Sequence, residues 1–281
     1  MRWSLLGIAL GLAATIGPGG GGATAAAAEG DSWAPPPPEE TWFQVFAGSA
    51  RVGYAHHKVS RVFGTLIVEE QFQALIKGKV ARFDTVVVYA TKGGPQPQEA
   101  TATTALAGVK LMEGKVTFDA KGGEKAAARV QVKGFADRNL KITSPPKAQT
   151  SEQPVPDGPV VFQSALPYVA PLLVPKAGRL EGVTLAEFPD DIDFPALLNL
   201  KPGRTLERTA PDPTGRWQIV MTAPQRGGPP APVARMTFDE KGALVKHEWA
   251  KFVFQPASQE DALAPVEAAP PPAKDDKKPG A

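Results

Sequence analysis

Apolar and polar residues alternate with a period of two along much of residues 41–255, which is typical of β-strands with one buried face. The alternation is plainest at 79–90, where Arg82 and Asp84 occupy one face. The opposite face carries Ala81, Phe83, Thr85, Val87 and Tyr89. The pattern predicts strands at 41–47, 52–62, 65–76, 79–90, 109–112, 115–120, 127–133, 140–143, 217–222, 233–238 and 243–254.

Glycine positions refine this prediction. Gly53 lies inside the strand expected at 52–62, and an interior glycine marks a bulge or a close approach of another backbone. Gly78, between Lys77 and Lys79, indicates either a tight turn or a bulge in one long strand. Near the C-terminus, residues 239–242 read Asp-Glu-Lys-Gly, which predicts a well-defined turn joining the two strands of a hairpin.

The segment 160–174 departs from the alternation, because its sequence VVFQSALPYVAPLLV is almost entirely apolar. Pro167 and Pro171 argue against one long helix, so we expect one or two helical turns packed over the sheet. In one interpretation the segment lines or covers a ligand cavity, and in the other it fills the core. The ligand-binding interpretation assigns Val160, Phe162, Leu166, Tyr168, Leu172 and Leu173.

These elements define a mainly β fold, with a large curved antiparallel sheet or half-open barrel and a short apolar helical segment. One domain is expected over 41–255, with an alternative subdivision near 145–158. A linker is expected at 144–159 and irregular structure at 178–213. The Pro-rich stretch 29–40 is expected to be an extended linker, and 256–281 a disordered tail.

The N-terminal segment has the pattern of a secretory signal. Arg2 precedes an uncharged apolar run at 3–16, and small residues follow up to Ala28, where cleavage is expected, with Ala25 as the alternative. An uncleaved anchor is the other interpretation. After cleavage no transmembrane span is expected. The signal pattern predicts export. Because the chain has no cysteine and hence no disulfides, a bacterial periplasm or extracellular location is expected rather than a eukaryotic secretory pathway.

Charge adds little to this picture. The chain has a formal net charge of +2, but residues 41–255 hold 27 Lys and Arg against 20 Asp and Glu, a net +7. The basic residues are scattered, which favours a solvated surface over an anionic partner, and no nucleic-acid partner is expected. The expected partners are a lipid or other amphiphile, or another envelope protein.

No motif for catalysis or metal binding is recognisable. His56 and His57 are adjacent in a predicted strand and therefore point to opposite faces, and His247 is the third histidine. Asp190, Asp191 and Asp193 lack the spacing of a calcium loop, and no serine lies in a nucleophile elbow. We therefore expect no catalytic residue, no metal and no cofactor.

Two resemblances complete the sequence analysis. The stretch from Trp42 to His56, with Val-Gly-Tyr-Ala-His at 52–56, resembles the start of uncharacterised exported β domains of planctomycete type. Some of those domains are similar to β regions that precede transglutaminase-like domains. This chain cannot carry that enzyme activity, because it lacks the cysteine nucleophile. The expected curved sheet, the apolar segment and Phe-Asp-x-x-Gly at 238–242 resemble periplasmic lipoprotein carriers, which implies an incomplete barrel that encloses acyl chains.

Three functions follow from these observations. The first is a non-enzymatic envelope protein acting as a structural or interaction module. The second is a carrier that binds a lipid or another amphipathic ligand in the concavity of the sheet. The third is a hydrolase whose site the sequence does not reveal. An apolar cavity of several hundred cubic ångströms would favour the carrier.

Overall fold

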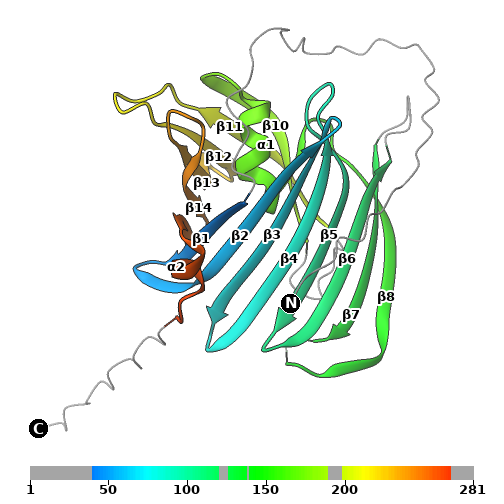
Figure 1. Cartoon of the computed structure of the whole chain (residues 1–281). Helices are drawn as coiled ribbons and strands as arrows, with labels where there is room; N and C mark the ends of the chain where they lie inside the picture. Colours follow the sequence, from blue (N-terminus) through cyan, green and yellow to red (C-terminus); the bar gives the residue numbers. More distant parts are fainter. Residues whose placement is uncertain (1–39, 120–125, 138, 189–197, 267–281) are drawn as a thin grey trace, which may run out of the picture.

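The computed structural model describes residues 40–119, 126–137, 139–188 and 198–266. The expected signal segment 1–28, the expected linker up to residue 39 and the three aspartates at 190–193 lie outside these residues. Fifteen strands of the described chain form one sheet, which confirms the mainly β prediction with a large curved antiparallel sheet (Figure 1).

The first eight strands form an antiparallel meander in chain order. Their inner faces carry the apolar residues of the period-two pattern. The strands are β1 (Glu40–Ala47), β2 (Ala50–Val62), β3 (Thr65–Ile76), β4 (Lys79–Ala90), β5 (Gln96–Leu106), β6 (Val109–Asp119), β7 (Ala127–Ala136) and β8 (Ile142–Pro154). Lys77-Gly78 forms a two-residue turn between β3 and β4, so the sequence there breaks into two strands rather than bulging.

Gly53 occupies a position that no other residue fits. It pairs with Val45 of β1, next to a register shift between Val45 and Phe46. A Cβ atom at Gly53 would lie 1.8 Å from the backbone oxygen of Gln73. The expectation of a bulge or a close backbone approach is therefore confirmed in both forms.

The second half of the chain turns back into the concavity and then returns to the first strand. It contains β9 (Val160–Phe162), a 3-10 turn η1 (Gln163–Ala165), α1 (Leu166–Leu173), β10 (Gly178–Glu187), β11 (Asn199–Arg208), β12 (Trp217–Gln225), β13 (Gly228–Phe238), β14 (Leu244–Trp249), β15 (Phe252–Ala257) and α2 (Gln259–Leu263). β9 pairs with β10 in parallel, and every other neighbouring pair is antiparallel. β15 pairs with β1, so the two halves join into one continuous sheet.

Several boundaries predicted from the sequence were wrong. The expected linker at 144–159 is mostly strand β8, an exposed strand at the edge of the sheet. Pro145 and Pro146 are tolerated there because an edge strand has a neighbour on one side only. The irregular region expected at 178–213 contains β10 and β11. The two strands predicted within 109–120 are one strand, β6, with Gly114 paired inside it.

The C-terminal hairpin is confirmed at its turn but not along its full length. Asp239 Oδ1 accepts hydrogen bonds from the backbone N–H groups of Lys241 and Ala243, at 2.9 and 2.8 Å. The strand predicted at 243–254 is divided, because Ala250 adopts a left-handed conformation with φ of 51° and begins a second turn. Residues 250–251 therefore connect β14 to β15.

The tail expected from residue 256 begins as ordered structure. β15 runs to Ala257, and the Ser258 hydroxyl caps α2 by accepting the N–H of Asp261 at 3.0 Å. Arg51 Nη2 donates to the backbone oxygen of Ala262 at 2.6 Å, and Ala262 is fully buried. The sequence missed this helix because its single apolar anchor is an alanine in a segment rich in polar residues.

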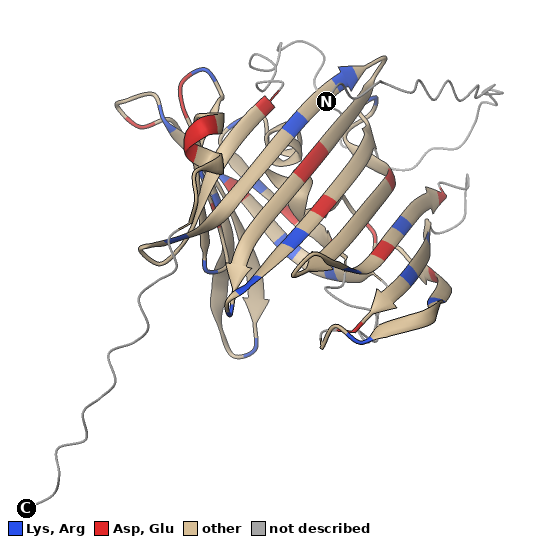
Figure 2. Ribbon diagram, turned by 60° about the horizontal axis from the view of Figure 1, so that its bottom comes forward, with Lys and Arg blue, Asp and Glu red and all other residues tan. Residues whose placement is uncertain are grey.

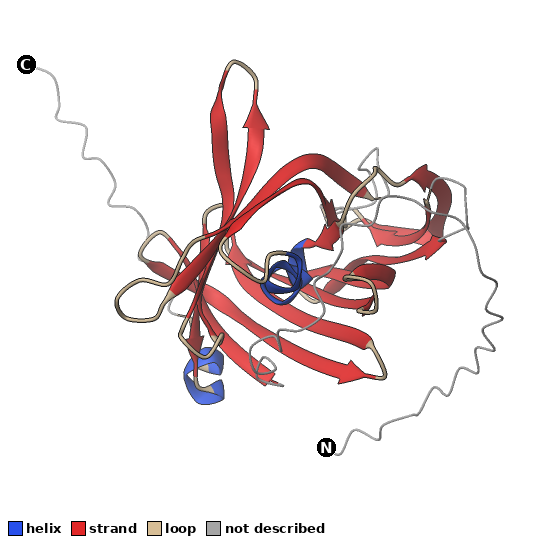
Figure 3. Cartoon of the chain, turned by 90° about the horizontal axis from the view of Figure 1, so that it is seen from above, coloured by secondary structure: helices blue, strands red, loops and turns tan. Residues whose placement is uncertain are grey.

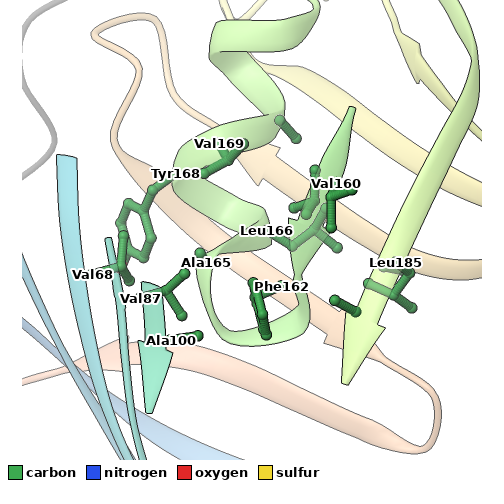
Figure 4. Close-up of a cluster of buried hydrophobic side chains, with 14 of the residues drawn as sticks. Val68, Val87, Ala100, Val160, Phe162, Ala165, Leu166, Tyr168, Val169 and Leu185 are labelled. Atoms are coloured by element: carbon green, nitrogen blue, oxygen red, sulfur yellow. The ribbon is translucent and has the colours of Figure 1, made fainter. Parts of the chain in front are cut away.

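The segment 160–174 lies inside the curve of the sheet, whereas α2 lies on its outer side (Figure 3). Tyr168 reaches toward Val68 on the first half of the sheet, and Leu166 lies beside Val160 (Figure 4). Val68, Leu166 and Val169 are fully buried. α1 and the strands around it therefore form one core, and α1 fills the part of the concavity nearest the β2–β3 turn.

The outer surface carries mixed charge. Lys, Arg, Asp and Glu are interspersed along the strands (Figure 2), and pairs such as Lys115–Glu99, at 2.9 Å, link neighbouring strands. None of the described helices has the length and apolar character needed to cross a membrane.

Candidate functional site

The six residues predicted to bind a ligand divide into two groups. Val160, Leu166 and Tyr168 are buried in the core, and Leu172 and Leu173 pack against it half-buried. Phe162 belongs to the buried group and also lines a pocket that opens below the segment. The structure therefore brings the six residues together, with one of them on a pocket wall.

The pocket has a volume of about 480 Å³, within the ~300–1,000 Å³ range of small-molecule sites. It lies between the two halves of the sheet, at the end that carries the β3–β4 turn. Phe162, Gln163 and Ser164 separate it from α1. Its apolar walls come from Phe72, Ile76, Phe83, Ala102, Phe162, Ala186, Phe188, Trp249, Phe252 and Phe254.

Alternation along the strands positions the aromatic walls. Phe72 on β3 and Phe83 on β4 are directly paired on the inner face, with their ring centroids 5.8 Å apart. Phe72 also meets Phe252 of β15 edge to face at 5.7 Å. Since β15 pairs with β1 and β3 lies two strands beyond it, the curvature of the sheet closes this wall.

Two local features shape the mouth of the pocket. The Phe188 ring packs against Gly114, where an added Cβ would approach the ring to 2.9 Å. Ala250 lines the pocket from the β14–β15 turn, where its left-handed conformation begins the two-residue loop.

A buried polar chain lies beside the pocket. His57 of β2 is 1% exposed, and its Nε2 lies 3.1 Å from Glu70 Oε1 on β3. Its Nδ1 lies 2.8 Å from the Tyr168 hydroxyl on α1. Glu70 lines the pocket, so these hydrogen-bonded side chains run from the pocket wall along the inner face of the sheet to the helix.

When His57 is neutral, its two hydrogen bonds determine which ring nitrogen carries the proton. Nε2–H donates to the Glu70 carboxylate, and Nδ1 accepts the Tyr168 O–H. Burial, and then the charge of Glu70, raise the pKa of Tyr168 well above its usual value. The phenol therefore stays protonated and attaches α1 to the sheet.

His247 is the second buried histidine, 4% exposed and stacked on Phe254 with ring centroids 5.1 Å apart. Burial, followed by the charge of His57, lowers the pKa of His247 to about 3. Neither of its ring nitrogens has a hydrogen-bond partner among the described residues. His247 therefore lies in the core, against the pocket-wall residue Phe254.

A second pocket of about 370 Å³ adjoins the first. The two share the wall residues Gln163, Glu187, Trp249 and Ala250. The second pocket is also lined by Leu185, Lys201, Arg204, Pro232 and Val233. The second pocket therefore places Lys201 and Arg204 beside the first pocket, which we call the aromatic pocket.

Most of this site was not predictable from the sequence. Phe83 lay on a predicted inner face, but nothing indicated that it would meet Phe252 across the sheet, because that contact depends on the pairing of β1 with β15. Trp249 lay in a strand predicted to continue straight through 250–251. No group of three or more metal-ligating side chains occurs among the described residues.

Comparison with known proteins gives one structural likeness. No protein-family model matches the chain, and no curated protein is similar enough to count as a relative. A solved structure, a β-barrel-like protein of a domain of unknown function (DUF1849) from Brucella abortus, is 11% identical, with a TM-score of 0.46. The likeness covers 77% of this chain and 93% of that one. The resemblances to planctomycete-type domains and lipoprotein carriers stay predictions.

Proposed function

We propose that this protein binds an apolar or amphipathic small molecule in the aromatic pocket. The supporting observation is the pocket of about 480 Å³, walled largely by aromatic rings and open beside two cations. A filled core was the alternative, and α1 fills only part of the concavity. The proposal selects the carrier among the three functions that the sequence left open.

The pocket walls support an apolar or amphipathic ligand because seven of the lining residues are aromatic. Burying apolar ligand surface against them yields roughly 25 cal/mol per Å². Glu70 is the more buried of the two acids on β3, and its Oε1 atom already accepts a hydrogen bond from His57. The walls also carry polar side chains, among them Thr85, Thr104 and Ser164, which can contact the polar part of an amphiphile.

The proposal assigns no catalytic role to Glu70, His57 and Tyr168. A carboxylate, an imidazole and a hydroxyl in this order resemble the arrangement that activates a nucleophile. Here the hydroxyl belongs to a tyrosine that is 4% exposed and absent from the pocket wall. A substrate in the pocket would meet the carboxylate end of the chain, so the three groups serve to hold α1.

We further propose that the protein acts in a bacterial envelope, outside the cytoplasm. The support is the sequence of the N-terminal segment, in which Arg2 precedes an apolar run and small residues up to Ala28. N-terminal sequencing of the protein from its own host tests this. A new N-terminus close to Ala28 supports export, whereas an intact Met1 on protein recovered from the cytoplasmic fraction contradicts it.

The test of binding uses the neutral fluorophore N-phenyl-1-naphthylamine. Saturable binding of one molecule per chain is expected for the wild-type protein. Ala102→Phe places a ring in the pocket and is expected to weaken binding tenfold or more. Ala105→Phe, on the opposite face of β5, is the matched control and keeps wild-type affinity.

Thermal unfolding of both variants establishes that each is folded before binding is compared. Absence of saturable binding to the wild-type protein overturns the proposal, as does equal binding by the two variants. Native mass spectrometry of protein from its own host, with lipid extraction of the same sample, then identifies the natural ligand.

A further inference from the structure

Lys201 and Arg204 line the same pocket although their spacing along β11 should separate them. Residues three apart in a regular strand point to opposite faces. Here Lys201 pairs with Leu185 and Arg204 with Val183, with a register shift between the two pairs. Pro202 and Gly203 form the extra length, and Gly203 has φ of 73°. This bulge turns both cations toward one cavity.

The two cations differ in their partners. Lys201 is paired with Glu187, which lines both pockets. Arg204 Nε is buried and has no hydrogen-bond partner among the described residues. A buried N–H of a charged group without an acceptor is costly, and a bound anion would supply one.

The charges along the joined pockets favour an anion at this end. Glu70 and Glu187 are the acids; Glu187 is paired with Lys201, and Glu70 accepts a hydrogen bond from His57. Arg204 adds positive charge to the wall of the second pocket, and Lys251 adds it to the wall of the aromatic pocket. Lys251 Nζ lies 5.3 Å from the centroid of the Phe252 ring. The charged residues that line the two pockets are therefore three cations and two acids, a net charge of +1.

We propose that the ligand is an amphiphile with an anionic head group, a carboxylate or a phosphate, bound by Arg204 with Lys201 nearby. Its apolar tail occupies the aromatic pocket, and Trp249 forms the wall between head and tail. This inference rests on the proposed function, because it assigns the chemistry of the ligand for that same site. A guanidinium suits both head groups, since its planar fork matches either set of oxygens.

The test compares four compounds with one chain length and different heads: dodecanoate, dodecyl phosphate, dodecanol and dodecyltrimethylammonium. Each displaces bound N-phenyl-1-naphthylamine, below the concentration at which the compound aggregates. At least one anion is expected to bind about tenfold or more tightly than dodecanol, as a charge-assisted hydrogen bond predicts. Preference for dodecanoate indicates a fatty-acid head, and preference for dodecyl phosphate indicates a phospholipid-like head.

Arg204→Met tests the assigned residue. The ratio of anion to dodecanol affinity is expected to fall toward one in this variant. Arg129→Met, which removes an exposed arginine from β7 on the far part of the sheet, is the control and keeps the wild-type ratio. If Arg204→Met does not fold, the ranking of the four compounds on the wild-type protein still decides the question.

The outcomes separate the two proposals. Equal binding of dodecanol and both anions, or a preference for the cation, overturns the anionic head group and leaves the proposed function intact. No binding of the fluorophore and of all four compounds overturns the proposed function itself.

Discussion

The Tyr89 hydroxyl on β4 accepts a hydrogen bond from the backbone N–H of Phe162 at 2.9 Å. β4 and β9 lie far apart in the order of the sheet, so this bond joins two strands that are not neighbours. Phe162 then meets Phe118 of β6 edge to face at 5.9 Å. The edge of the sheet that carries β9 is therefore held inside the concavity, above the pocket.

Tyr89→Phe tests this attachment. The variant leaves the buried N–H of Phe162 without an acceptor, and we expect the free energy of unfolding to fall by about 1–3 kcal/mol. Urea denaturation at pH 7 measures the change. Tyr54→Phe is the control, because its hydroxyl lies 3.5 Å from Gln73 Oε1 in a half-buried position. Equal losses in the two variants would contradict the role assigned to Tyr89.

Gly53→Ala tests the close approach of β2 and β3. A methyl group cannot lie 1.8 Å from the oxygen of Gln73, so the strands must separate, with an expected loss of about 3 kcal/mol or more. Gly228→Ala is the control, since its nearest atom would be 3.5 Å away on a flexible side chain. Chemical denaturation compares them, and a loss below about 1 kcal/mol at Gly53 would show that the strands adapt.

His247 predicts how stability depends on pH. Its pKa is about 3 in the folded protein and about 6.5 in the unfolded chain. Between these values the unfolded chain binds a proton that the folded protein does not. The contribution of His247 to the free energy of unfolding is therefore fully present above pH 6.5. It is lost as the pH falls toward 3, at about 1.4 kcal/mol per pH unit.

His247→Leu removes this contribution. Between pH 7 and pH 5 the wild-type protein is expected to lose about 2 kcal/mol more than the variant does. Urea denaturation at the two pH values measures both losses. Met236→Leu, at the fully buried residue paired with His247 on β13, is the control and keeps the wild-type pH dependence. Identical pH dependence in His247→Leu and the wild-type protein would show that His247 does not titrate in this way.

Trp249 offers an optical test of the ligand site. Because it lines both pockets, ligand binding is expected to change the intrinsic tryptophan fluorescence, and Trp249→Phe removes this change. Trp217→Phe is the control, since Trp217 stacks on Phe238 at 4.2 Å away from the pocket walls. Titration with dodecanoate measures the signal in each protein. A change that persists in Trp249→Phe would place the ligand elsewhere.

The sequence was informative where structure is local. The inner face of β4 and the turn at 239–242 follow from alternation and from turn chemistry, and both are present as predicted. Ala250-Lys251 was missed because two-residue turns of this kind usually contain Gly, Asn or Asp. β8 was missed because its prolines are tolerated only at an edge, and edges are not visible in a sequence.

The site was harder to predict because its walls come from distant segments. Phe162 was identified from its apolar surroundings, whereas Phe72, Trp249 and Phe254 meet only when β15 pairs with β1. Lys201 and Arg204 share a pocket because of a bulge that period-two alternation cannot reveal. Local patterns therefore predicted the sheet, and long-range pairing determined the pocket.

The pairing of β1 with β15 also has a kinetic consequence. Gln44 on β1 contacts the backbone of Asp261, 217 positions later, so the central pair of the sheet needs both ends of the domain. Such long-range pairing slows folding, because loop-closure entropy is lost before the contacts form. The strand that completes the pairing of β1 is therefore among the last to be synthesised, and we expect the sheet to close only when nearly the whole domain is available.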